Sequence, residues 1–270
     1  MPRFLLRIEY AGTRYRGWQI QNNARTVQGE IARAAGEVLR SDNFELYGSG
    51  RTDAGVHAIE QIAHLDTAVK IAPARLADEI NALLPADINI LSAETVDRRF
   101  HARHSATARS YLYQIARRRT AFAKPYVWWV REPLDVARMR DAATAFTGMH
   151  DFRAFSDDDP EEKSTKVLLE ALTIEEEGSL LLVRITGSHF IWKMVRRIVG
   201  ILVEAGQGRF SKRDIERMLK GDSDLPAQLT APASGLFLER VSYSGTELRA
   251  GTGTGPDQVQ ATRIGIKASL

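Results

Sequence analysis

Residues 48–57 read Gly-Ser-Gly-Arg-Thr-Asp-Ala-Gly-Val-His and follow the strand-like Phe44-Glu45-Leu46-Tyr47. These ten residues combine one acid, one fixed cation, two hydroxyls, one imidazole and three glycines. Glycine lets the backbone approach a ligand closely and adopt a positive φ, and an arginine beside a short acid favours the ionised carboxylate. The stretch therefore predicts a tight loop in which Asp53 is a nucleophile, a general base or a structural anchor.

Three other interpretations of this loop were compared with a catalytic one. A phosphate-binding P-loop needs a lysine and a Ser or Thr after its last glycine, whereas Val56-His57 stands there. A metal site built from Asp53, His57 and His64 has no standard ligand spacing. A third possibility, which stays open, is that Asp53 and Arg51 form an ion pair that only stabilises a turn. Because a buried ion pair adds little to stability, this pairing favours a functional role without proving it.

The composition is that of a globular protein and excludes several kinds of chemistry. The chain has 270 residues, 44% hydrophobic and 26% charged, enough for one large domain or two ordinary ones. It contains no cysteine, which excludes disulfides, thiolate catalysis and cysteine-ligated metals. The N-terminus has no signal-peptide layout, and the longest apolar run, 198–205, contains Glu204 and is too short for a bilayer. We therefore expect a cytoplasmic protein without a membrane partner.

Charge is distributed unevenly along the chain. The net charge is only +3, but residues 98–119 contain seven arginines, two histidines and no acid, interleaved with Phe100, Tyr111 and Tyr113. An acidic cluster occupies residues 157–162. The dense mixture of basic and aromatic residues at 98–119 favours contact with nucleic acid. The alternative is that the basic and the acidic segment are both merely solvated surfaces.

Hydrophobic periodicity and capping signals predict alternating strands and helices. Strands are expected over residues 3–10, 43–47, 59–65, 88–96, 108–116, 167–176, 180–186 and 236–243. Helices are expected over residues 27–40, 73–84, 136–146, 190–205 and 212–221, with caps at Thr26, Asp135 and Ser211. This order predicts an α+β fold with a largely antiparallel sheet, a boundary near residues 100–110 and a flexible Gly/Thr-rich lead to a C-terminal tail.

Two further features have both a structural and a functional interpretation. On the helix 190–205, Lys193, Arg196 and Arg197 gather on a narrow arc opposite the apolar face. This arc is either solvated or presents a cation to an acid or a phosphate. Tyr111 is either a half-buried strand residue or a ring that stacks on a base and offers its hydroxyl.

The motifs resemble, in order and over residues 4–243, the TruA family of tRNA pseudouridine synthases. The resemblance rests on Gly50–Ala58 (GRTDAGVHA), Tyr10–Thr13, Arg16–Gln21, Thr26–Gly29, Asn81–Ile88, Phe100–Arg103, Arg109–Tyr113, Gly148–Phe152, Lys163–Thr165, Met194–Arg196 and Ala231–Leu236. It implies a pseudouridine synthase fold, in which two similar α/β halves form a basic cleft. The corresponding domains are residues 1–105 and 106–244, followed by a flexible tail, 245–270.

The resemblance also implies an activity and roles for individual residues. The family isomerises uridine to pseudouridine in tRNA, and its bacterial members act on positions 38–40 of the anticodon arm as homodimers, with neither cofactor nor metal. Asp53 is the implied catalytic carboxylate, Arg196 its basic partner, and Tyr111 the ring packed on the target base. We further expect Arg51, His57, Arg103 and Arg109 to bind the substrate, with Arg51 and His57 holding the displaced nucleotide or its phosphate.

Two competing functions were weighed against this enzyme. A catalytically silent RNA-binding protein would need no acid, so the presence of Asp53, Tyr111 and Arg196 together speaks against it. A base-removing glycosidase usually needs a second carboxylate, and the sequence suggests none near Asp53. The acidic segment 155–162 departs from the family pattern, so we do not expect it to contact RNA, and the tail receives no role.

Overall fold

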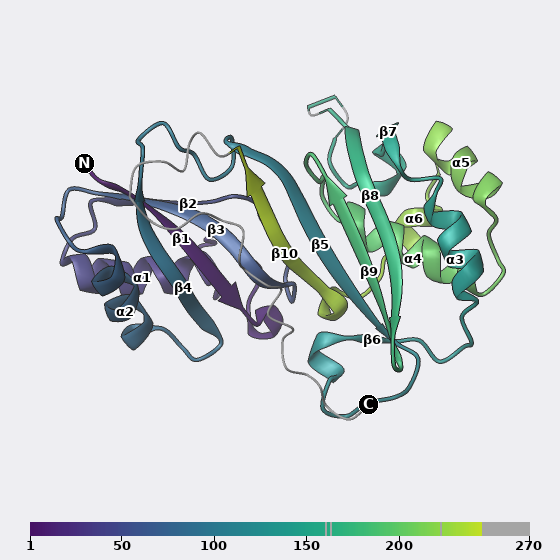
Figure 1. Cartoon of the computed structure of the whole chain (residues 1–270), viewed down its shortest axis with the longest axis horizontal. Helices are drawn as coiled ribbons and strands as arrows, with labels where there is room; N and C mark the ends of the chain where they lie inside the picture. Colours follow the sequence, from purple (N-terminus) through teal and green to yellow (C-terminus); the bar gives the residue numbers. More distant parts are fainter. Residues whose placement is uncertain (160, 163, 222, 245–270) are drawn as a thin grey trace.

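One mixed sheet runs through the whole protein (Figure 1). The computed structural model describes residues 1–159, 161–162, 164–221 and 223–244, and ten strands of these residues form the sheet. The main path has the order β4-β1-β3-β10-β5-β9-β8-β7, while β2 pairs with β3 and β6 with β5. The strands are β1 Arg3–Tyr10, β2 Phe44–Gly48, β3 His57–Thr67, β4 Ile88–Val96, β5 Ala106–Ala116, β6 Trp128–Trp129, β7 Gly148–Asp151, β8 Lys166–Glu177, β9 Leu180–Gly187 and β10 Leu236–Tyr243. In the described residues only β10–β3 and β5–β6 are parallel pairs, which confirms the predicted α+β fold with a largely antiparallel sheet.

Three of the helices, α1 Val27–Leu39, α3 Val136–Ala143 and α5 Lys212–Lys220, begin at residues whose side chains cap them. The other described helices are α2 Pro73–Leu83, α4 Met194–Gly206 and α6 Leu225–Gln228, with 3-10 turns η1 Gly12–Arg14, η2 Lys124–Tyr126, η3 Arg153–Phe155 and η4 Ala233–Gly235. The side chains of Thr26 and Asp135 accept hydrogen bonds from the first turns of α1 and α3. Ser211 and Asp214 form a complete capping box on α5. These caps confirm the predicted helix starts.

The helices gather in two groups at the ends of the sheet, with β10 and β5 between them (Figure 1). The helices α1 and α2 pack with the early strands around one buried core, and α3, α4 and α5 contribute to a second. The last strand, β10, joins the two, because Leu236 belongs to the second core and Leu238 to the first. The division into domains 1–105 and 106–244 stays a prediction, and the predicted tail 245–270 lies outside the described residues, as do Pro160 of the acidic cluster and Lys163.

The predicted helix 190–205 is wrong at its start. The helix α4 begins only at Met194, because Lys193 has a left-handed backbone with φ of 63°. The preceding Phe190 instead packs edge-to-face on Tyr111, with ring centroids 5.0 Å apart. The apolar residues 190–192 thus continue the helical pattern in the sequence but form a non-helical segment, whose Phe190 packs against the central strand β5. The short strands β6 and β7 escaped prediction because two to four residues carry too little periodic signal.

The arginine-rich segment 98–119 does not form one patch. The strand β5 fills most of it, and its eleven residues span about 35 Å. Arg98, Arg99 and Arg103 therefore lie before one end of this strand, and the arginines at 117–119 follow its other end. Two of the arginines are paired with acids, Arg99 with Asp97 and Arg117 with Glu176. A basic cleft between the two halves stays a prediction.

Candidate active site

The loop between β2 and β3 carries Asp53, and hydrogen bonds with residues of β3 fix it. The amide of Ser49 donates to the carbonyl of Ile62 at 2.7 Å. The buried side chain of Gln61 accepts from the Ser49 hydroxyl at 2.7 Å and donates to the carbonyl of Gly50 at 3.0 Å. A buried amide that satisfies two loop groups at once restricts the loop to one conformation.

The segment that follows β1 holds the other side of this loop. The amide of Trp18 donates to the Thr52 carbonyl at 3.1 Å, and the Tyr10 and Thr52 hydroxyls are 2.8 Å apart. Gly17 has a φ of 98°, and a Cβ there would lie 2.5 Å from the Thr52 carbonyl oxygen, so this close approach requires glycine. Asp53 is thus presented on a loop fixed by β1, β3 and the segment between β1 and α1.

Asp53 forms an ion pair with Arg196. The distance from Arg196 Nη1 to Asp53 Oδ2 is 3.3 Å, and the two side chains are 17% and 27% exposed. Arg196 stands in the first turn of α4, where the helix dipole disfavours a cation. Its Nε donates to the carbonyl of Ala231 at 2.7 Å, which fixes the guanidinium from the other side. The pair leaves the second carboxylate oxygen of Asp53 available to a substrate.

Tyr111 lies at the centre of the sheet, close enough to Asp53 for the two to interact electrostatically. It is in β5, opposite Leu238 of β10 and Ile185 of β9. Burial raises the pKa of Tyr111 to about 12; the charge of Arg109 opposes this shift, and that of Asp53 adds to it. Its phenol is therefore neutral at physiological pH. Among the described residues no hydrogen-bond partner occupies its hydroxyl, so this group is free to meet a ligand.

The predicted substrate contacts have different surroundings. Arg51 and Arg103 are exposed, and their side chains make no ion pair or hydrogen bond with other described residues. Arg109 is largely buried and donates to the carbonyls of Ser49, Arg103 and Ser188 at 2.8–3.1 Å. Arg51 and Arg103 are placed to meet an anion, whereas Arg109 ties the start of the Asp53 loop to neighbouring segments.

His57 is enclosed by the protein. It is 1% exposed, its Nδ1 accepts from the amide of Gly12 at 3.0 Å, and its Nε2 lies 3.0 Å from the carbonyl of Pro125. The first contact requires an unprotonated Nδ1, so Nε2 carries the proton and donates it to Pro125. Burial also lowers the pKa of His57, which favours this neutral ring. Both nitrogens are engaged, so the geometry gives no support to a contact of His57 with the substrate.

The acidic segment after η3 is bound to the start of α4. Asp157 pairs with Lys193, at 2.5 Å, and with Arg197, whose side chain is only 5% exposed. The carboxylate of Asp158 accepts from the amide of Trp192 at 2.8 Å. A solvated arc on α4 is therefore the wrong interpretation for Arg197, which is buried, and for Arg196, which faces Asp53.

Sequence reasoning missed the residues that hold the loop, namely Tyr10, Gln61 and the carbonyl contacts of Arg109. One signal was available for Gln61, a polar residue within the otherwise apolar run of β3. Polar side chains at buried strand positions need internal partners, and the Asp53 loop supplies them. Tyr10 carries no such signal, because a terminal tyrosine on the inner face of β1 is also typical of core packing.

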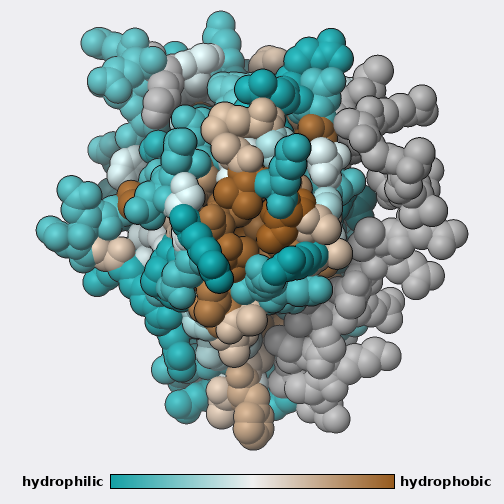
Figure 2. All heavy atoms as spheres, turned by 90° about the vertical axis from the view of Figure 1, so that its left-hand side faces the viewer, coloured by the Kyte–Doolittle hydropathy of each residue, from teal (hydrophilic) through white to brown (hydrophobic). Residues whose placement is uncertain are grey.

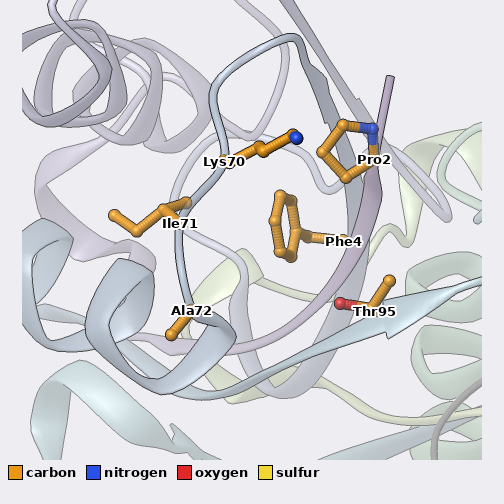
Figure 3. A pocket seen from close by; sticks show the side chains of 6 residues that line it. All are labelled: Pro2, Phe4, Lys70, Ile71, Ala72 and Thr95. Atoms are coloured by element: carbon orange, nitrogen blue, oxygen red, sulfur yellow. The ribbon is translucent and has the colours of Figure 1, made fainter.

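Two cavities in the described residues lie away from this loop, and the larger, of about 450 Å³, is lined by residues of α3 and of the segment 208–214. The other, of about 360 Å³, is lined by Pro2, Phe4, Lys70, Ile71, Ala72 and Thr95 (Figure 3); Lys70 is its one ionisable side chain, and the cavity shares no residue with the loop. In the described ranges, no three His, Asp or Glu side chains are grouped so that they could hold a metal ion. No described helix is both long enough and apolar enough to cross a membrane.

Comparison with known proteins gives one consistent result. The family model described as tRNA pseudouridine synthase matches residues 7–105 and 142–244. The chain is 38% identical to the tRNA pseudouridine synthase A of Aquifex aeolicus, over 89% of this chain and 99% of the relative. It is 42% identical to that of Nitrobacter hamburgensis, over 90% and 100% respectively. A crystal structure of a Cbf5-Nop10-Gar1 complex is similar over 74% of this chain and 54% of the other, at 10% identity and a TM-score of 0.30, too weak a likeness to support an argument.

Proposed function

The chain belongs to the tRNA pseudouridine synthase family and isomerises uridine in tRNA, and we propose that Asp53 is the carboxylate that carries this reaction. The observation that supports this role most directly is the Asp53–Arg196 pair on a fixed loop, with the unoccupied hydroxyl of Tyr111 beside it. Within the described residues this pair engages one carboxylate oxygen of Asp53 and remains partly exposed, so the other oxygen has capacity for a ligand.

The reaction makes specific demands on such a site. The C1′–N1 bond of the nucleotide breaks, the uracil turns, a C1′–C5 bond forms, and the proton lost from C5 is balanced by the proton that N1 gains. An ionised carboxylate either attacks the sugar carbon, or stabilises charge there and removes a proton. In both routes Arg196 stabilises the charge of Asp53 and holds its orientation. The neutral ring of Tyr111 would stack on the detached base and keep it in the site.

The target uridine must leave its base stack before it can reach Asp53, which costs a few kcal/mol. Arg51 and Arg103 are exposed cations without acidic partners in the described residues, and they would bind the phosphates of the displaced nucleotide. We further propose that the substrate positions are 38–40 of the anticodon arm, that no metal takes part, and that the enzyme acts in the cytoplasm, where its tRNA substrate is used.

We also propose that the enzyme works as a homodimer. Figure 2 shows the side of the molecule that lies on the left in Figure 1, where hydrophobic side chains gather in the middle of a hydrophilic rim. The same side carries α1, α2 and the strand β4, an end of the sheet path in the described residues, whose Leu91 is 48% exposed. An exposed apolar patch with a polar rim is typical of a subunit contact. Sedimentation of the purified protein at micromolar concentration would give the mass of two chains.

The decisive experiment incubates the wild-type protein and Asp53→Asn with unmodified tRNA and maps pseudouridine. We expect product at positions 38–40 with the wild type, also in chelator-treated buffer. For Asp53→Asn we expect a rate lower by roughly 10²- to 10⁴-fold or more. Asp159→Asn changes an exposed acid elsewhere and is the matched control, with wild-type activity. Product from Asp53→Asn at the wild-type rate would refute the role of Asp53.

A further inference from the structure

The segment between β5 and β6, residues 117–127, forms an arm that leaves the sheet below the start of β10 (Figure 1). Within this arm Phe122 is 90% exposed, more than any other large hydrophobic side chain in the described residues. The nearby Trp129 is 41% exposed. A single exposed aromatic residue needs no explanation, but two beside a set of cations indicate a binding surface.

The same arm carries positive charge that the protein does not neutralise. Arg118, Arg119 and Lys124 are exposed, and within the described part of the chain no acid lies at ion-pair distance from them. The guanidinium of Arg119 lies 5.7 Å above the ring of Trp129. Unpaired cations interleaved with exposed aromatic rings match the chemistry of a single-stranded nucleic acid, with phosphates for the cations and unstacked bases for the rings. A protein partner would call for a less charged apolar surface.

The base of the arm is fixed to the strand that follows the Asp53 loop. The carbonyl of Pro125 accepts from His57 Nε2, and the rings of Tyr126 and His57 are 5.1 Å apart. The hydroxyl of Ser234, in η4, donates to the carbonyl of Val127 at 3.3 Å. His57 follows Asp53 by only four residues, which span at most about 14 Å. An RNA whose uridine reaches Asp53 is therefore close to the arm.

We propose that this arm is a second tRNA-binding surface, at which Phe122 stacks on an unpaired base outside the target nucleotide and Arg118, Arg119 and Lys124 bind backbone phosphates. The inference deepens the proposed function and rests on it for the identity of the RNA. It also gives His57 a role that its burial allows: His57 positions the arm relative to Asp53.

The test measures the Kd for unmodified tRNA and the single-turnover rate at saturating enzyme, for Phe122→Ala and for the triple variant Arg118→Ala/Arg119→Ala/Lys124→Ala. We expect Phe122→Ala to raise Kd by roughly 5- to 100-fold, as the loss of one stacked base does, with the saturated rate unchanged. For the triple variant, the slope of log affinity against log salt should be about 2 units shallower. Met149→Ala and Arg213→Ala/Lys220→Ala remove exposed side chains from β7 and α5 and should leave both quantities at the wild-type values.

Three outcomes would overturn the proposal. The first is a wild-type Kd and salt slope in both arm variants. The second is a lower saturated rate at unchanged Kd, which would mean that the arm acts on Asp53 through His57 and binds no RNA. The third is a change of oligomeric state without a change of Kd, which would identify Phe122 as a subunit contact. Failure of the proposed function is distinguishable, because the wild type would then form no pseudouridine, whatever the Kd of the variants.

Discussion

Arg196 and Arg197 are neighbours in the first turn of α4, and each is paired with an aspartate from a distant loop. The Arg196–Asp53 pair has one contact of 3.3 Å and remains partly open to solvent. In the other pair Arg197 is buried, and Asp157 is shared with Lys193. The two pairs use the same residue types, so chemistry alone does not distinguish them. The two acids are similarly exposed, 27% for Asp53 and 29% for Asp157, but Arg196 is 17% exposed and Arg197 only 5%. Asp157 also binds a second cation, so the Asp53 pair is the one with room for a substrate, and the Asp157 pair fixes the start of the helix that carries Arg196.

The largest difference between the pairs should appear in the reaction rate. We expect Arg196→Met to lower the saturated single-turnover rate by roughly 10²- to 10³-fold, as the loss of one group that stabilises charge in an active site does. Arg197→Met, at the next position of the same helix, should lower it by less than about 10-fold, because Arg197 acts only through the position of α4. Rapid-quench measurements on unmodified tRNA give both rates. Equal losses in the two variants would mean that the two pairs do not differ in function.

The order of effects should reverse for stability. Asp157→Ala leaves the buried Arg197 with Lys193 beside it and no counter-charge, so we expect the free energy of unfolding to fall by about 1–3 kcal/mol. Asp53→Ala should change it by less than about 1 kcal/mol, since the arginine that it leaves unpaired, Arg196, is 17% exposed whereas Arg197 is 5% exposed. Urea unfolding followed by circular dichroism measures both, and Asp159→Ala is the control for a general effect of removing an acid from this segment. A larger loss for Asp53→Ala than for Asp157→Ala would contradict the assignment of the Asp157 pair as structural.

The smallest effect concerns pH. Burial opposes ionisation of Asp157, but the hydrogen bond from Lys193 and the charge of Arg197 outweigh it and hold the pKa of this carboxyl below its ordinary value of 3.8. A group with a lowered pKa in the folded state contributes stability above 3.8, and the contribution is lost as the pH falls through the lowered pKa. The stability difference between wild type and Asp157→Ala should therefore be constant from about pH 7 to pH 5 and shrink below about pH 4. Urea titrations across this range measure the difference, and a constant value down to pH 3 would exclude the ion pair as its source.

Much of the secondary structure could be predicted because its signals are local. The strands β1, β4 and β10 have the expected bounds, and α1, α3 and α5 begin at the expected caps, since alternation, capping residues and glycine each act within a few positions. The start of α4 could not be predicted in this way. Its apolar pattern extends back to Phe190. In the structure, however, Phe190 lies before the helix and packs on the ring of Tyr111, a residue distant in the sequence.

The candidate site divides in the same manner. The motif around Asp53 was visible in ten consecutive residues, and Arg196 followed from the resemblance of a second motif to a known family. Asp53 and Arg196 are 143 residues apart in the sequence, and no local pattern encodes a contact over that distance. The same limit explains His57. Its place in the motif predicted a substrate contact, whereas Gly12 and Pro125 take both ring nitrogens.

The sequence by itself determined the types and approximate positions of most strands and helices, the family, and the acid on which the proposed chemistry depends, because these follow from short-range backbone preferences and contiguous motifs. Only the tertiary structure decided that Arg196 pairs with Asp53 while Arg197 is buried against Asp157, that the arginine-rich segment is divided by β5, and that the base of the arm at 117–127 is bound to His57, four residues after Asp53. The physical reason is that burial, and with it the strength and availability of a charge, is a property of the surroundings that distant segments create together.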